Sequence, residues 1–172
     1  MREISAGGVV LREISGVWHV ALIEPQKEVR PEAPPRKPAR ASLALPKGLI
    51  DPGETAPITA VREVHEETGL TAEIVAKLAD TRYVYVRKWS DGERVFKIVS
   101  FYLLRYVSGE IDDVTQAMRV EVIRAVWIPL REASSHLMYS NERKVLHMAE
   151  DYVAKNGLVA VKISPKKFGR SE

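Results

Sequence analysis

Residues 48–70 read GLIDPGETAPITAVREVHEETGL, and this stretch decides the fold. Thr55 is a residue type that commonly caps the N-terminus of a helix, and Pro57 follows where a first helical turn tolerates proline. Gly69 is of the type that most often follows the last turn of a helix. The segment therefore predicts one helix that begins after Thr55 and runs to about Thr68.

Three glutamates share one face of this predicted helix. Glu63, Glu66 and Glu67 are spaced i, i+3 and i+4, so at ~100° per residue they lie within an arc of about 100°. Val61 and Val64 project from a different face, which can pack on a sheet. Like charges at this spacing repel one another, and the helix dipole disfavours negative charge in the C-terminal half. A bound cation would remove this cost, whereas the spacing taken alone would also fit a solvated acidic face.

The wider segment resembles a known motif. Gly48, then five residues, Glu54, then seven residues, and REVHEETGL at residues 62–70 together resemble the complete Nudix box. Nine constrained positions match without a gap, and average residue usage makes a chance match on the order of 10⁻¹⁰ per starting point. The resemblance is to the Nudix hydrolase family. It implies an α/β (α+β) fold, the Nudix α/β/α sandwich, in which a mixed β-sheet carries helices on both faces.

The resemblance also implies roles for the residues of the motif. The implied metal ligands are Gly48, through its carbonyl, Glu63, Glu66 and Glu67. Arg62 is implied to orient a glutamate, here Glu54, rather than to bind substrate. Val64 and Leu70 are implied core residues, and His65 is expected to point away from the metal site.

The implied reaction is hydrolysis of a phosphoanhydride bond in a nucleoside-diphosphate derivative. Carboxylate oxygens favour Mg²⁺, with Mn²⁺ as a substitute, and such an ion neutralises a polyphosphate and activates water. The catalytic candidates are Arg62, Glu66, Glu67 and Glu121, and the carboxylate that accepts the proton of the water is left open among the glutamates. Glu121 stands at the start of a predicted strand, where several family members place an additional glutamate. A surface charge at a strand start is the alternative reading.

Residues outside the motif point to a substrate class. Residues 45–48, LPKG, resemble the subfamily that hydrolyses diadenosine polyphosphates and diphosphoinositol polyphosphates, which implies that Lys47 reaches the phosphate chain. Residues 81–85 and 94–97 resemble the bacterial members of that group. The candidate substrate-binding residues are Lys47, Tyr83, Tyr85, Lys97 and Tyr139. Tyr83 and Tyr85 share one strand face and could stack on a base or fill the core, and Lys47 could instead be a solvated loop residue.

Three functions compete at this point. The leading hypothesis is hydrolysis of a diadenosine polyphosphate such as diadenosine tetraphosphate, with ATP as one product. The alternative within the same chemistry is a (deoxy)nucleoside triphosphate pyrophosphohydrolase that acts on oxidised nucleotides. The alternative of another class is a non-catalytic nucleotide-sensing or RNA-binding protein with the Nudix fold. Intact motif glutamates disfavour the sensor, and the lack of an aromatic-interleaved basic motif disfavours a nucleic-acid partner.

The remaining elements complete the predicted fold. The predicted strands are 3–13 and 17–24, which form a hairpin through Ser15-Gly16, then 43–45, 71–87, 93–107 and 121–128. Residues 46–48 are predicted to form a loop, and residues 89–92 (WSDG) a hairpin turn. A helical stretch opens at Pro129, and a last helix runs from about Asn141 to Lys155.

The chain of 172 residues fits a single domain over residues 1–172. Residues 25–41 contain five prolines and several basic residues. Proline lacks the backbone donor that a helix or central strand needs, so this segment is predicted to be a proline-rich basic insertion between strands. This insertion departs from the compact family pattern, and its arginines could extend a phosphate site or be solvated. Residues 158–172 form a basic tail. The overall net charge of +3 therefore combines basic flanks with an acidic centre, which suits a metal-bound polyphosphate.

Composition narrows the functional class further. The chain has no cysteine, which excludes disulfides, thiolate metal sites and cysteine nucleophiles. No apolar run approaches the ~20 residues of a membrane span, and charges interrupt the N-terminal apolar stretch, so no secretory signal is expected. The expected location is the cytoplasm, and the expected partner is a small nucleotide or polyphosphate. The oligomeric state stays open between monomer and homodimer.

Overall fold

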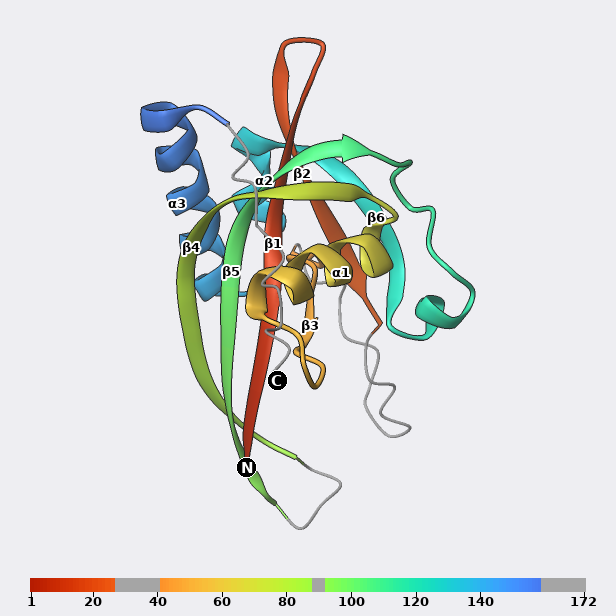
Figure 1. The fold of residues 1–172 in the computed structure, drawn as a ribbon, viewed down its shortest axis with the longest axis vertical. Helices are drawn as coiled ribbons and strands as arrows, with labels where there is room; N and C mark the ends of the chain where they lie inside the picture. The colour runs from red at the N-terminus through yellow and green to blue at the C-terminus, as the bar shows by residue number, and fades with distance from the viewer. Residues whose placement is uncertain (27–40, 88–91, 159–172) are drawn as a thin grey trace, which may run out of the picture.

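The computed structural model describes residues 1–26, 41–87 and 92–158, which are built around a six-stranded sheet (Figure 1). The strands are β1 (Arg2–Ile14), β2 (Val17–Pro25), β3 (Lys47–Leu49), β4 (Thr71–Val86), β5 (Arg94–Ser108) and β6 (Val122–Pro129). Their order is β4-β5-β1-β2-β6, and β3 pairs with β1 beside this row. β1 and β5 run parallel, while the other pairs are antiparallel. The sheet is therefore mixed, as predicted.

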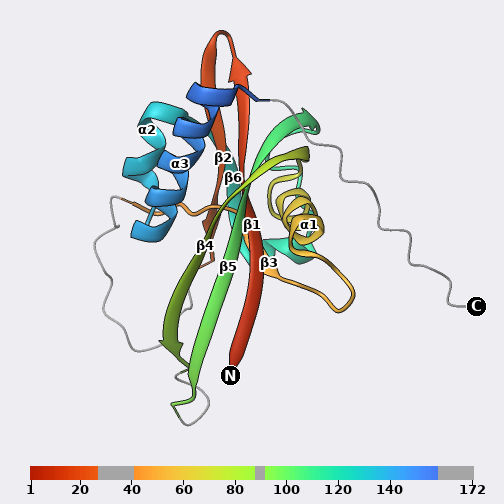
Figure 2. The same ribbon diagram turned by 60° about the vertical axis from the view of Figure 1, so that its left-hand side comes forward.

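Helices cover both faces of the sheet. The helices are α1 (Ala56–Thr68), the short 3₁₀ helix η1 (Ala117–Val120), α2 (Leu130–His136) and α3 (Ser140–Asn156). Figure 2 shows α1 against one face, and α2 and α3 together against the other. This three-layer arrangement confirms the predicted α/β/α sandwich. No helix in the three described ranges is long and apolar enough to cross a lipid bilayer.

β1 lies at the centre of the sheet and separates two layers of core. Its side chains alternate, so Val9 and Leu11 pack beneath α2 and α3, whereas Val10 packs beneath α1. A strand covered on both faces needs an apolar run rather than an alternating one, which explains AGGVVL in this strand. A side chain at Gly8 would overlap Leu104, and it would also crowd Val64 of α1. Glycine at this position therefore lets α1 approach the sheet closely.

The predicted ends of α1 are confirmed. Thr55 is its N-cap residue, although its side chain makes no capping hydrogen bond. At the other end Gly69 has φ 82°, a left-handed conformation that glycine adopts without strain, and its N–H bonds the carbonyl of His65. Val64 and Leu70 are fully buried and His65 is exposed, as predicted.

The prediction for residues 43–48 is wrong. Residues 43–45 do not form a strand but make two isolated bridges, Leu43 with Leu137 and Ala44 with Ile23. They are buried, so their apolar run serves the core rather than a ladder. The strand is instead β3, which pairs Lys47–Leu49 with β1 where a loop was predicted. Pairing begins after Pro46 because proline has no N–H to contribute, although its carbonyl accepts from Gly8.

The other predicted strands and the last helix agree with the structure within one residue at each end. The helix predicted at Pro129 is α2, with Pro129 as its N-cap residue. The 3₁₀ helix η1 was not predicted. The hairpin turn at residues 89–92, most of the insertion 25–41 and the basic tail 158–172 lie largely outside the described residues.

Candidate active site

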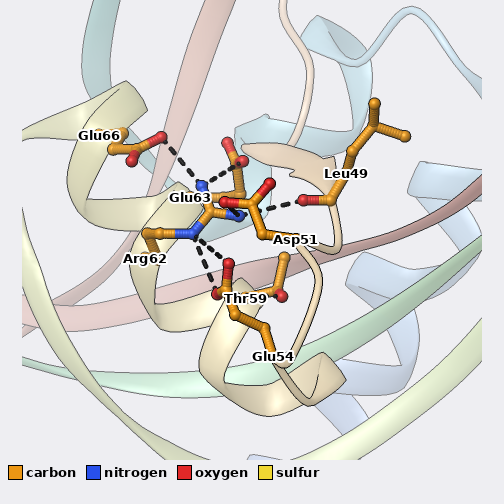
Figure 3. Close-up of polar contacts among 7 residues, drawn as sticks. All are labelled: Leu49, Asp51, Glu54, Thr59, Arg62, Glu63 and Glu66. Atoms are coloured by element: carbon orange, nitrogen blue, oxygen red, sulfur yellow. Dashed lines mark hydrogen bonds and ion pairs between the residues drawn. The ribbon is translucent and has the colours of Figure 1, made fainter.

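Arg62 is the centre of a carboxylate cluster between α1 and the loop that precedes it (Figure 3). Its Nε donates to Glu54 at 2.9 Å and 3.0 Å, which confirms the predicted pairing. Its other contacts are Leu49 O at 3.0 Å, Asp51 at 3.4 Å, Glu63 at 2.8 Å and Glu66 at 3.2 Å. The hydrogen bond with Glu54 raises the pKa of the Arg62 guanidinium above its ordinary value, and Glu63 adds to this rise. One cation thus orients most of the acidic cluster.

Glu63 and Glu67 are the buried carboxylates of α1, with 7% and 4% of the residue exposed. Burial raises the pKa of Glu67 well above its usual range, and the negative charge of Glu63 raises it further. The backbone N–H and the ammonium group of Lys47 offset part of this rise. Burial also raises the pKa of Glu63, against the opposing effect of Arg62. For both glutamates the fold therefore disfavours the charged carboxylate, and a nearby positive charge would stabilise it.

The Glu67 side chain also has one oxygen that forms no hydrogen bond. Its Oε2 is buried and has no hydrogen-bond partner, a condition shared among the described residues by Ser5 Oγ alone. A buried polar atom without a partner costs about 1–3 kcal/mol, and more if it is charged. A hard cation would satisfy this oxygen.

Gly48 lies directly against the cluster from β3. A Cβ atom at this position would overlap the carboxyl group of Glu63, so glycine leaves room for that carboxyl group where it now lies. Lys47 and Gly48 are consecutive in β3, and their side-chain directions therefore alternate: Gly48 faces Glu63 of α1, and Lys47 faces Glu142 of α3. The short strand thus presents Gly48 to the face covered by α1 and Lys47 to the face covered by α3.

The donor set fits a divalent cation such as Mg²⁺ or Mn²⁺. Its oxygens are hard, anionic and partly buried, and Oε2 of Glu67 has no hydrogen-bond partner. Among the described residues, no three acidic, histidine or cysteine side chains converge as a metal cage. Glu63 and Glu66 instead both accept hydrogen bonds from Nη1 of Arg62. Ligation by Gly48, Glu63, Glu66 and Glu67 thus stays a prediction that the chemistry of the site supports.

Glu121 lies close enough to influence this cluster. It is exposed, immediately before β6, and its charge contributes to the raised pKa of both Glu63 and Glu67. The backbone around it is fixed, because its N–H bonds Met118 O and its carbonyl accepts from Gln26. The fold therefore brings this residue, distant in sequence, to the carboxylates of α1. Its role as a base stays a prediction.

A pocket of about 430 Å³ opens on the face of the sheet covered by α3. Its lining residues are Lys47, Thr81, Tyr83, Val99, Phe101, Met138, Tyr139, Ser140, Asn141 and Glu142. Three of the five predicted substrate-binding residues, Lys47, Tyr83 and Tyr139, are therefore brought together. The Lys47 ammonium lies 5.2 Å from the centre of the Tyr139 ring. The volume is within the range of ~300–1,000 Å³ that small-molecule sites commonly show.

Tyr85 and Lys97 do not line this pocket but lie beside it. The Tyr85 ring centroid is 6.2 Å from that of Tyr83, so the two tyrosines share a strand face as predicted. Lys97 Nζ is 5.9 Å from the centre of the Tyr83 ring. Burial lowers the pKa of Lys97, and the nearby Lys47 ammonium lowers it further. Two cations thus face the same region of the sheet.

Glu142 is a site residue that the sequence analysis missed. It is 3% exposed and pairs with Lys47 Nζ at 2.7 Å. Burial alone would lower the pKa of Lys47, but the Glu142 carboxylate outweighs burial and raises it. A signal was present in the sequence, because Glu142 has helical spacing with the buried Val145, Leu146 and Ala149. A carboxylate on the apolar stripe of a helix indicates a buried partner.

Arg62→Lys is expected to lower kcat about tenfold and Tm by about 3 °C, because an ammonium group cannot reproduce the planar fork that holds several carboxylates. Steady-state kinetics and calorimetry measure the two effects. Arg105→Lys is the matched control, because Arg105 forms an exposed pair with Glu73 at 2.8 Å, and it should change neither value. If Arg62→Lys and Arg105→Lys had the same kcat and the same Tm, the orienting role of Arg62 would be contradicted.

Comparison with known proteins agrees with the motif. The sequence model of the family described as NUDIX domain matches residues 2–149. The protein named MutT4 of Mycobacterium tuberculosis is 38% identical over 157 residues, which cover 90% of this chain and 57% of that protein. The 8-oxo-(d)GTP phosphatase of Mycolicibacterium smegmatis is 32% identical over 146 residues, which cover 83% of this chain and 39% of that protein. The chain thus spans about half the length of these curated relatives.

A solved structure shows the same fold. The C. elegans Ap4A hydrolase, as a binary complex, superposes with a TM-score of 0.63 at 21% identity, over 89% of this chain and 98% of that chain. At this identity the likeness concerns the fold alone. Because the family model covers most of the chain and the motif is complete, this chain belongs to the NUDIX domain family.

Proposed function

We propose that this chain is a metal-dependent Nudix hydrolase that cleaves a phosphoanhydride bond of a nucleoside polyphosphate. The observation that carries the proposal is the buried, partnerless oxygen of Glu67 next to Glu63, with Lys47 reaching the pocket from the neighbouring strand. Carboxylates for a cation and an ammonium for phosphate thus lie on the two sides of β3. This combination suits a substrate with a polyanionic centre and an uncharged end.

The proposed chemistry needs a water molecule, a base and a cation. Mg²⁺ held by Gly48, Glu63, Glu66 and Glu67 would neutralise phosphate charge and make the phosphorus more electrophilic. Water forms a bond to one phosphorus, the bridging P–O bond of the anhydride breaks, and a carboxylate accepts the proton of the water. Glu66, Glu67 and Glu121 are the candidate acceptors. Lys47 would hold the phosphate chain, and Arg62 would keep the glutamates in place.

The pocket is suited to the nucleoside end of the substrate. Tyr83, Tyr139 and Phe101 offer ring surface, and Asn141 and Ser140 offer hydrogen-bonding groups. The only charged lining residues of the described pocket are Lys47 and Glu142, which neutralise each other. An uncharged base or nucleoside therefore fits the interior, and Tyr85 and Lys97 would contact the substrate beyond its rim.

Two substrate classes remain, and the relatives favour the oxidised nucleoside triphosphates. The relatives at 38% and 32% identity are named MutT4 and 8-oxo-(d)GTP phosphatase, and the pocket beside Lys47 has room for one nucleoside. The diadenosine polyphosphates are the second candidate, supported by the LPKG resemblance. Either substrate belongs to the cytoplasmic nucleotide pool, which is the proposed location.

The test is a hydrolysis panel with Mg²⁺, Mn²⁺ or a chelator. It includes 8-oxo-dGTP, dGTP, diadenosine tetraphosphate, a nucleotide sugar and capped RNA, in ¹⁸O-labelled water to locate the attacked phosphorus. We expect metal-dependent turnover, fastest on 8-oxo-dGTP. Faster turnover of diadenosine tetraphosphate with release of ATP would establish the second candidate instead. Nucleotide binding without hydrolysis of any substrate would overturn the enzymatic proposal in favour of a sensor.

Lys47→Ala is expected to raise KM about tenfold for polyphosphates of three or more phosphates, because hydrogen bonds to charged groups are the stronger ones. The effect should be smallest for a nucleotide sugar, whose phosphate chain is shorter. Initial rates across the panel measure this difference. An equal rise for short and long substrates would exclude a phosphate contact for Lys47.

A further inference from the structure

Glu142 holds two points of the chain segment that leads into β3. Its Oε1 accepts a hydrogen bond of 2.7 Å from the backbone N–H of Leu45, and its Oε2 pairs with Lys47 Nζ, also at 2.7 Å. Glu142 belongs to the first turn of α3, 95 residues beyond Lys47 in the sequence. One buried carboxylate therefore ties α3 to the segment that carries both Lys47 and Gly48.

The two oxygens of Glu142 have separable functions. The bond to Leu45 N–H fixes the backbone, which a neutral acceptor could do as well. The bond to the ammonium group needs a negative charge, because it aims Lys47 at the pocket and holds it 5.2 Å from the Tyr139 ring centre. An ammonium group has three N–H donors, so one bond to Glu142 leaves the others available. A free lysine would spread over many rotamers instead.

The charge of Glu142 also affects which end of a substrate can enter the pocket. Of the described lining residues, Glu142 is the single anion, and it faces the interior beside Lys47. A phosphate group beyond Lys47 would meet this carboxylate and be repelled. An uncharged nucleoside would not. The pair thus favours one direction of binding, with the nucleoside in the pocket and the phosphates toward the carboxylates of α1.

We propose that Glu142 is a positioning residue that orients Lys47 for the phosphate chain and thereby sets the direction in which the substrate lies. This inference rests on the proposed hydrolysis of nucleoside polyphosphates. It assigns to Glu142 no contact with the reacting atoms. Its effect is expected in substrate binding, through Lys47, rather than in the chemical step.

Glu142→Gln is the informative substitution, because glutamine keeps the volume and one acceptor for Leu45 N–H but presents no charge to Lys47. We expect KM for the preferred triphosphate to rise about tenfold, as for Lys47→Ala, with kcat changed less than about threefold. Glu150→Gln is the matched control on the same helix, because Glu150 is only partly buried and pairs weakly with His147 at 3.7 Å. The control should leave KM unchanged.

A double-mutant cycle distinguishes positioning from general support of the fold. If Glu142 acts through Lys47, Glu142→Gln raises KM no more than about twofold further in the Lys47→Ala background. Multiplicative effects of the two substitutions would overturn the inference, as would a fall in kcat with unchanged KM. If Glu142→Gln does not fold, Glu142→Asp is measured instead. Aspartate keeps the negative charge, but its shorter side chain holds the carboxylate farther from Lys47. An unchanged KM for Glu142→Asp would equally overturn the inference.

A binding measurement separates this inference from the proposed function. Calorimetric titration with a methylene-bridged, non-hydrolysable triphosphate and Mg²⁺ reports affinity without turnover. Weaker binding by Glu142→Gln, in a wild type that hydrolyses the triphosphate, supports both proposals. Equal binding by the two proteins, with an active wild type, overturns the positioning role alone. A wild type that binds the analogue but hydrolyses nothing overturns the enzymatic proposal, and the affinity difference still decides the role of Glu142.

Discussion

Glu67→Gln is expected to lower kcat about 10³-fold, within the ~10²–10⁴ typical of a lost acid–base group, while the protein becomes more stable. The activity falls because the substitution removes the carboxylate whose free oxygen best fits a cation. The stability rises because glutamine carries no charge into a buried position. Steady-state kinetics at saturating Mg²⁺ and calorimetry in metal-free buffer measure the two effects.

The pH dependence of the stability gain checks its cause. Folding raises the pKa of Glu67 above its ordinary value of 4.5, so the folded protein binds this proton more tightly than the unfolded chain does. The wild type therefore loses stability as pH rises through the folded pKa, and Glu67→Gln does not. The Tm difference should grow as pH rises from the ordinary pKa toward the folded pKa, and vanish below the ordinary pKa, where the group is protonated in both states. A constant difference would point to packing instead.

Glu66→Gln separates the two effects. Glu66 has 39% of its side chain exposed and pairs with Arg62, so its negative charge is not expected to destabilise the folded protein. This variant should also lose kcat by orders of magnitude, but without a gain in Tm. Near-wild-type turnover of either purified variant would refute the metal or base role of the glutamate concerned.

Gly48→Ala is expected to lower kcat at least about 100-fold, because a displacement of catalytic groups by ~1 Å can have an effect of that size. The added methyl group would occupy the space that the Glu63 carboxyl group fills, so that carboxyl group would be displaced from the metal site. Mg²⁺ affinity, followed by titration calorimetry with the substrate analogue, should fall together with kcat. Activity assays over a range of Mg²⁺ concentrations reveal how much of the loss added metal can restore.

Gly53→Ala is the control for this substitution. Gly53 has φ 84°, so alanine there is strained, but a Cβ atom would meet nothing within 4 Å. This variant should lose stability of about 1 kcal/mol and keep its kcat. If Gly48→Ala and Gly53→Ala lose activity equally, the contact between Gly48 and Glu63 has no special role.

The fold and the carboxylate helix could be predicted because their signals are local. The spacing of Glu63, Glu66 and Glu67, and the glycine at position 69, depend only on helical geometry. The pairing of Arg62 with Glu54 followed from the family resemblance and is confirmed by the contacts. Five of the six strands, all except β3, were found within one residue at each end because alternation and turn residues mark them over short distances.

The features that sequence did not reveal depend on tertiary contacts. The apolar run at residues 43–45 reads as a strand by itself, and only the packing of those residues into the core excludes a ladder. The function of Glu142 requires knowledge that α3 returns to the segment before β3. Tyr85 and Lys97 could be placed on a strand face but not inside or outside a pocket, because pocket shape depends on α3.

The alternation in β3 places a constraint on how this protein can evolve. A strand side chain keeps its face only while its distance along the strand stays fixed, so an insertion or deletion of one residue exchanges the two faces. Lys47 would then turn toward the glutamates of α1, and its neighbour toward the nucleoside pocket. Residues 46–49 are therefore expected to tolerate no insertion or deletion during divergence, whereas a loop elsewhere does.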